Sequence, residues 1–159
     1  MVIINHYWKK KVGKKIYIVS LEVSVCPICG EVLIVIGSRL RKVIENETDT
    51  VVLVIRRLRC KQCRVIHHEL PDMVVPYKRH SAETVEKAVS GETDDCSKRM
   101  IQRIRAWWAA CCVYFESILT SLREKYGAAL SQKSAPKEII RAVVNAHLWP
   151  QTRSVMTPA

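Results

Sequence analysis

Two pairs of cysteines are the residues whose type and spacing most clearly predict chemistry in this sequence. Cys26 and Cys29 form one Cys-x-x-Cys pair, followed by Gly30, and Cys60 and Cys63 form a second pair. Each pair can make a tight turn that presents both thiolates to one metal ion, and four sulfurs suit tetrahedral Zn²⁺ at about 2.3 Å. We therefore predict a zinc site with four protein ligands, which is structural because it leaves no open position for a substrate.

Other interpretations of these residues stay open at this point. Cysteine pairs can be buried thiols, redox sites or ligands of an iron–sulfur cluster. His67 and His68 follow Cys63 closely, and either could replace a thiolate as ligand, although both also fit a strand beside the site. Cys96 has no partner at a ligand spacing, and Cys111 and Cys112 lie within an apolar run that predicts core positions.

The segment between the two cysteine pairs predicts a β-hairpin. Two strand-like stretches flank the polar segment 45–49, where a turn is expected. A metal that joins the base of such a hairpin to a neighbouring turn defines a zinc ribbon. A further strand is expected after the second cysteine pair, and two short ones before the first. The predicted strands are residues 2–8, 15–20, 32–36, 39–44, 50–59 and 65–69.

The second half of the chain has helical periodicity. Pro71 and Pro76 predict an extended connector from 71 to 80, because residues before proline avoid the helical region. Ser81 and Ser97 are typical N-cap residues, and Gly91 predicts the end of the first helix. The predicted helices are residues 82–90, 98 to about 126 (one helix or two with a break), and 136–148.

These elements predict an α+β protein in which an N-terminal antiparallel zinc ribbon precedes a helical, helix-turn-helix-like part. The expected division is a zinc-ribbon domain over 1–80, a helical domain over 81–150 and a tail over 151–159. The turn between the first two helices is longer than in most helix-turn-helix units.

The charge of the chain predicts a polyanionic partner. Lys and Arg number 26 against 15 Asp and Glu, a net charge of +11, and double-stranded DNA is the partner that we expect first, with RNA as the alternative. Arginine and glutamine can each make paired hydrogen bonds to base edges. We expect base contacts from Lys98, Arg99, Gln102 and Arg103 and backbone contacts from Arg105, Arg56, Arg57, Arg59, Lys61, Arg64, Lys78 and Arg79.

Several stretches resemble the N-terminal zinc-binding region of bacterial insertion-sequence transposases. They are Cys-Pro-Ile-Cys-Gly at 26–30, Gly-Ser-Arg-Leu-Arg at 37–41, the arginine-rich segment 56–64 and Leu-Pro at 70–71. The chain is also similar to a family of small bacterial proteins that share this ribbon and the stretches 70–72 and 75–80. The resemblance implies zinc, a ribbon followed by a helix-turn-helix, and DNA binding. We expect no counterpart of the three-carboxylate catalytic domain of such transposases in this sequence.

The expected function is therefore DNA binding by a regulator or accessory factor without catalysis. No Gly-rich phosphate loop or nucleophile motif indicates an enzyme. The alternative is a protein-interaction adaptor, in which Trp107, Trp108 and Phe115 could form a contact patch for a protein partner or a second copy, whereas the other interpretation of Trp107, which we favour, is a core position. The longest apolar run, 106–115, is about half of what a membrane-spanning helix needs, so we expect no membrane partner and a cytoplasmic location.

Overall fold

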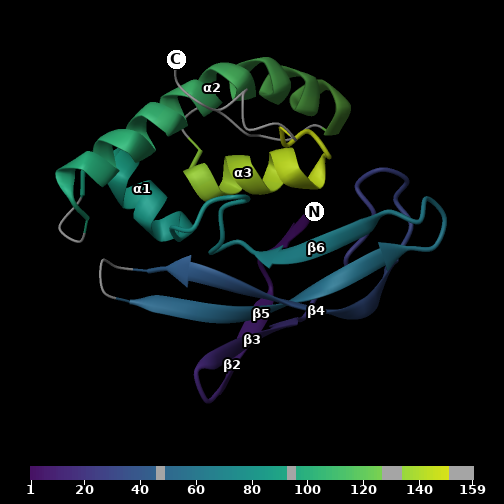
Figure 1. The fold of residues 1–159 in the computed structure, drawn as a ribbon. Helices are drawn as coiled ribbons and strands as arrows, with labels where there is room; N and C mark the ends of the chain where they lie inside the picture. The colour runs from purple at the N-terminus through teal and green to yellow at the C-terminus, as the bar shows by residue number, and fades with distance from the viewer. Residues whose placement is uncertain (46–48, 93–95, 127–133, 151–159) are drawn as a thin grey trace.

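A computed structural model describes residues 1–45, 49–92, 96–126 and 134–150. In this part of the chain, strands come first and helices follow (Figure 1). The strands are β1 (Val2–Ile4), β2 (Tyr7–Val12), β3 (Lys15–Ser20), β4 (Leu33–Ile44), β5 (Thr50–Cys60) and β6 (Ile66–Pro71). The helices are α1 (Ala82–Ser90), α2 (Lys98–Tyr126) and α3 (Pro136–Asn145).

Strand β5 is the centre of one mixed six-stranded sheet. It pairs with β4 along its whole length, as the predicted hairpin requires, and on its other side with β3 and then β6. The β3–β5 and β1–β6 pairs are parallel, and the order along the sheet is β1-β6-β5-β3-β2, with β4 paired to β5. The apolar N-terminal half of β5 suits this position, because Leu53, Val54 and Ile55 are buried.

The predicted fold, an antiparallel zinc ribbon followed by a helix-turn-helix-like helical part, is wrong. The hairpin is part of a larger sheet that includes the strands before Cys26, and the helices pack on that sheet (Figure 1). Local sequence patterns give strands and helices but not their long-range partners. The parallel pairs β1–β6 and β3–β5 join segments far apart in sequence, so periodicity could not reveal them.

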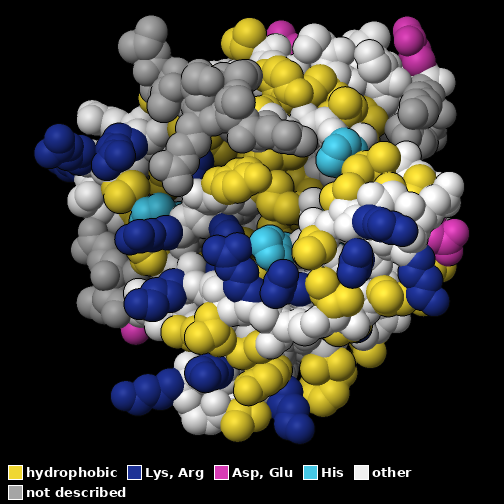
Figure 2. All heavy atoms as spheres, turned by 45° about the vertical axis from the view of Figure 1, so that its right-hand side comes forward, with side chains coloured by type: hydrophobic (Ala, Val, Ile, Leu, Met, Phe, Trp, Pro, Cys, Tyr) yellow, Lys and Arg dark blue, Asp and Glu magenta, His cyan; other side chains and the backbone are white. Residues whose placement is uncertain are grey.

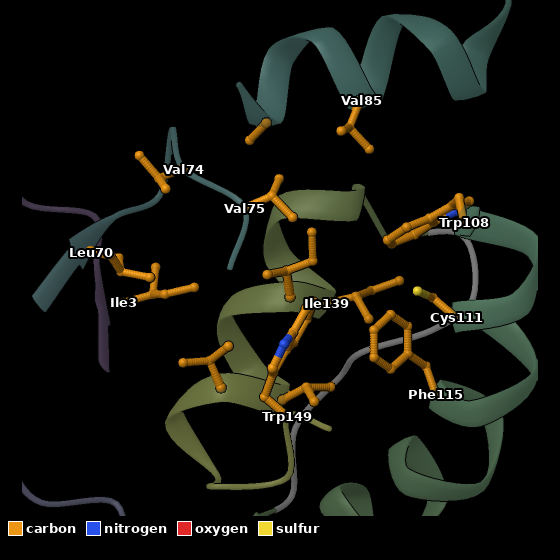
Figure 3. Packing of buried hydrophobic residues seen from close by; sticks show 14 of the residues in the cluster. Ile3, Leu70, Val74, Val75, Val85, Trp108, Cys111, Phe115, Ile139 and Trp149 are labelled. Atoms are coloured by element: carbon orange, nitrogen blue, oxygen red, sulfur yellow. The ribbon is translucent and has the colours of Figure 1, made fainter. Parts of the chain in front are cut away.

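One hydrophobic core joins the sheet to all three helices. Figure 3 shows Ile3 of β1 and Leu70 of β6 converging with Val85 of α1 and Ile139 of α3. Phe115 of α2 is 1% exposed, and its ring centroid lies 5.8 Å from that of Trp108 and 5.9 Å from that of Trp149. Helix α3 lies between α2 and the sheet (Figure 1), so it contacts α2 on one side and β1 on the other.

The ends of the helices follow local chemistry. Ser81 caps α1, since its hydroxyl accepts the Thr84 N–H at 3.1 Å, and Gly91 ends the helix at φ 94°. Helix α2 is a single helix of 29 residues. Helix α3 ends at Asn145, earlier than expected, where the Asn145 side chain bonds both backbone groups of Ile3 on β1 at 2.7 and 2.9 Å.

Some expectations fall outside the described residues. These are the tail over 151–159, part of the hairpin turn at 46–48 and part of the α1–α2 turn at 93–95. Among the described residues, no helix combines the length and the apolar character that spanning a membrane requires.

Candidate metal centre and basic groove

The four predicted cysteines meet at one point. Their sulfur atoms all lie within 4.8 Å of one another, with Cys26 and Cys63 3.6 Å apart and Cys29 and Cys60 3.4 Å apart. Four sulfurs at about 2.3 Å from one ion would lie about 3.8 Å from each other, so the observed spacing fits tetrahedral coordination. The four cysteines could therefore hold a metal ion.

Two turns of similar shape bring these sulfurs together. Cys26 and Cys29 lie on the turn before β4, where the Gly30 N–H donates to the Cys26 carbonyl at 2.8 Å. Cys60 ends β5, and the Cys63 N–H donates to the Cys60 sulfur at 3.5 Å, which lowers the pKa of that thiol. The residue after each second cysteine has positive φ, 78° at Gly30 and 59° at Arg64. Glycine makes this conformation easy in the first turn, whereas Arg64 adopts it in the second.

His67 lies beside the four cysteines, and its ring contacts the sulfur of Cys26. It is 1% exposed, and its Nε2 lies 3.5 Å from the Cys26 sulfur. Burial lowers the pKa of His67 to about 4, so the ring is neutral near pH 7. The Met1 amino group lies 3.2 Å from Nδ1. If it donates there, Nε2 carries the proton and points a donor at the sulfur.

A buried ion pair holds the loop that leads to the first cysteine turn. Glu69 on β6 is 1% exposed and accepts two hydrogen bonds of 2.6 Å from Arg56 on β5. The Ser24 hydroxyl donates to the same carboxylate at 2.7 Å. Arg56, which was expected to contact the DNA backbone, therefore also forms an internal ion pair, and its side chain is 31% exposed.

The structure brings part of the predicted nucleic-acid set together in one groove of about 610 Å³ between the connector and α2. Lys78 comes from the connector, and Arg99, Gln102 and Arg103 come from the first turns of α2. The remaining lining residues are His80, Val85, Met100, Ile104, Ala106 and Trp107. Among the described residues that line it, three are Lys or Arg and none is acidic, so this part of the groove is cationic. We call it the α2 groove.

The other predicted contact residues are distributed over three places. Lys98 and Arg79 are exposed, and each is next in sequence to a residue that lines the α2 groove. The Arg105 Nε–H donates to the Ala88 carbonyl at 2.6 Å, which fixes the end of α1 against α2. The cations at or near the second cysteine turn, Arg57, Arg59, Lys61 and Arg64, do not line the groove. Figure 2 shows Lys and Arg side chains spread over one face of the molecule, with acidic side chains mainly at its rim.

Sequence reasoning missed two features of the α2 groove. His80 lines it because Ile44 and His80 form a β-bridge that fixes the connector beside β4. Arg41 holds the connector as well, by donating to the Val75 and Lys78 carbonyls at 2.8 Å each. Arg41 lies in the stretch 37–41 and His80 in the stretch 75–80, both of which carry the family resemblance, but the sequence assigned neither residue to a groove.

The expected aromatic contact patch of an adaptor is wrong. Trp107, Trp108 and Phe115 are 4%, 8% and 1% exposed, so they are core residues. The Lys78 ammonium lies 4.5 Å from the centre of the Trp107 ring, which is a cation–π contact at the wall of the α2 groove.

Comparison with known proteins gives one match. No curated protein and no solved structure matches the chain. A family model described as a domain of unknown function, DUF6431, matches residues 26–107, which begin at the first metal-site cysteine and end at Trp107. The matched segment contains all four cysteines and every residue that lines the α2 groove. Because the match covers more than half of the sequence, the chain belongs to the DUF6431 family.

Proposed function

We propose that this protein binds double-stranded DNA through the α2 groove and acts as a regulator or accessory factor without catalysis. The observation that carries the proposal is the convergence of Lys78 from the connector with Arg99 and Arg103 from α2 in a groove whose described lining residues include no acidic one. Cations at that density attract a phosphate backbone, because each phosphate contact releases a condensed counterion. Gln102 and Lys98, exposed on the same first turns of α2, can reach base edges.

We propose Zn²⁺ as the ion of the four-cysteine site. Four thiolates in tetrahedral spacing favour zinc over the oxygen-seeking Mg²⁺ and Ca²⁺, and a fully occupied coordination shell gives a structural role. Atomic absorption of the purified protein should find one zinc per chain, and a Cys29→Ser variant should lose it. Iron with visible absorbance in place of zinc would contradict this assignment.

Fluorescence anisotropy with a labelled DNA duplex at several salt concentrations tests the DNA proposal. The logarithm of the affinity should fall linearly with the logarithm of the salt concentration. A double Arg99→Ala/Arg103→Ala variant should weaken binding at least about tenfold, and the slope should become shallower by about one for each phosphate that the variant no longer neutralises.

A matched variant separates the groove from net charge. Lys11→Ala/Lys14→Ala also removes two positive charges, but at the β2–β3 turn, outside the groove. It should change affinity much less than the α2 pair. Equal losses of DNA affinity in both variants, or no binding to any DNA duplex at low salt, would contradict the proposal. Tighter binding to an RNA duplex than to DNA would indicate that RNA is the partner.

The free edge of β4 supports a second candidate function, protein–protein contact with another copy of the chain. From Ile34 to Leu40, β4 pairs with β5 along one edge, and no other described strand pairs with its second edge. Val35 and Leu40 in this segment are 54% and 53% exposed. An apolar unpaired edge can add a strand from a second molecule. Sedimentation of the wild type should then show a dimer that Val35→Lys disrupts, whereas a monomeric wild type would remove this candidate.

A further inference from the structure

Two residues that line the α2 groove each have a buried nitrogen atom with no hydrogen-bond partner among the described residues. The two atoms are the Nε1 of Trp107 and the Nδ1 of His80. The indole N–H can only donate, Trp107 is 4% exposed, and its nitrogen atom is itself buried. Most buried polar groups in proteins have partners, so an orphaned donor in the wall of a groove indicates a missing acceptor.

The positively charged residues around these atoms indicate that the missing acceptor is an anion. Lys78, Arg99 and Arg103 contribute three cations to the groove, and helix α2 has no acidic residue in its first turn. The positive end of the helix dipole adds to the same potential. An anion with several oxygen acceptors therefore fits, and it would satisfy the indole N–H and the guanidinium groups together.

The apolar residues of the groove limit the anion further. Val85, Met100 and Ile104 line it beside the cations, and the volume of about 610 Å³ is large for a bare inorganic anion. A phosphate attached to an organic group would contact both parts of the wall. The connector that carries Lys78 and His80 is held in place by Arg41, so the groove is formed before any ligand enters.

We propose that the α2 groove contains a specific phosphate-binding site in which the Trp107 indole N–H and the Arg103 guanidinium donate to phosphate oxygens. This inference rests on the proposed function in one respect, because we assign the phosphate to the DNA backbone and the apolar wall to the attached sugar. The site makes one backbone phosphate of the duplex a fixed anchor. The remaining cations of the chain then act through general electrostatic attraction.

A Trp107→Phe variant tests the site, because it removes the N–H and keeps an aromatic ring in the core. Trp149→Phe is the matched control, since Trp149 is also buried, at 7% exposed, but does not line the groove. The four indole N–H signals in a ¹H–¹⁵N NMR spectrum are assigned with tryptophan variants. Inorganic phosphate should shift the Trp107 signal and leave the Trp149 signal in place.

The DNA arm of the experiment identifies the source of the phosphate. A duplex should shift the same Trp107 signal at far lower concentration than inorganic phosphate, and Trp107→Phe should weaken duplex binding about five- to tenfold while Trp149→Phe does not. Arg103→Gln, at an exposed position that cannot disturb the core, should weaken phosphate binding in the same way and covers the case in which Trp107→Phe does not fold.

The outcomes separate this inference from the proposed function. Duplex binding with an unmoved Trp107 signal and unchanged affinity in both variants would overturn the phosphate site and leave DNA binding intact. A Trp107 shift with inorganic phosphate but no binding to any duplex would support the site and overturn the DNA source, together with the proposed function. No shift with either probe would overturn the site.

Discussion

At the scale of single residues, the pair Arg56–Glu69 is a contact that the sequence did not predict. Arg56 lies in a basic run that predicts phosphate contacts, but its partner Glu69 is 13 residues further along the chain. Glu69 sits beside two histidines in a segment that gives no sign of an internal ion pair. The four cysteines, by contrast, were predictable because metal ligation imposes a spacing that is visible in the sequence itself.

Replacing Glu69 with glutamine should destabilise the protein by about 2 kcal/mol, since it leaves a partly buried guanidinium without its counter-charge. The value is at the low end for a broken buried pair because the Arg56 side chain is 31% exposed. The amide oxygen can still accept the Ser24 hydroxyl, but the amide nitrogen cannot accept the Arg56 Nε–H, so the change removes the charge together with one hydrogen bond. The midpoint of urea unfolding, at an unchanged m-value, measures the loss.

Glu83→Gln is the matched control for that substitution. Glu83 also forms an ion pair, with Lys87 at 2.9 Å, but its side chain is 74% exposed. Pairs of this kind contribute little, so the variant should stay within about 0.5 kcal/mol of the wild type. Similar unfolding midpoints for the two variants would show that Arg56–Glu69 does not stabilise the fold as its burial implies.

At the scale of elements, local sequence patterns predicted where strands and helices lie, but not which strands pair in the sheet. The strand 15–20 and the helix 82–90 were predicted with the bounds that the structure has, because β-branched runs and caps are local features. The β4–β5 hairpin followed from the polar turn between its strands. The sheet did not follow, since its parallel pairs, β3 with β5 and β1 with β6, join strands that are distant along the chain. The α2 groove depends on the same long-range packing, so Lys78, Arg99, Gln102 and Arg103 were predicted as contact residues but their position in one groove was not.

The cap of α1 gives a prediction at this scale. Ser81→Ala should cost about 1 kcal/mol, because the Ser81 hydroxyl satisfies the Thr84 N–H at a buried helix end. Ser97→Ala is the comparison, since the Ser97 hydroxyl meets the Met100 N–H at 3.4 Å in an exposed position and should contribute less. Thermal unfolding of both variants provides the measurement, and an equal loss in each would argue against burial as the reason.

At the scale of the whole molecule, the metal site and the α2 groove belong to different parts of one fold. A small hydrophobic cluster surrounds the cysteines and consists of Val2, Cys26, Leu33, Leu58 and Cys60. The large cluster joins the sheet to the three helices and contains none of these residues. An ion bound there would therefore stabilise the end of the β4–β5 hairpin, while the core under the helices has its own apolar contacts.

Removal of the ion should consequently loosen the cysteine turns and leave the helical core folded. Hydrogen exchange after chelation should accelerate at the amides of Cys26, Gly30 and Cys60, whose bonds build the turns, and the amides of Leu53 and Ile55 should keep their protection. Far-UV circular dichroism should retain the helical signal.

Two cysteine variants make this test specific. Cys29→Ser, at an exposed position of the metal site, should reproduce the effect of the chelator without any added reagent. Cys112→Ser removes a thiol that packs against the large cluster and lies outside the metal site, so its exchange pattern at the turns should match the wild type. Loss of the helical signal on chelation would mean that the two clusters unfold together, because the hairpin that the ion fixes also supplies Val43, Leu53 and Ile55 to the core under the helices.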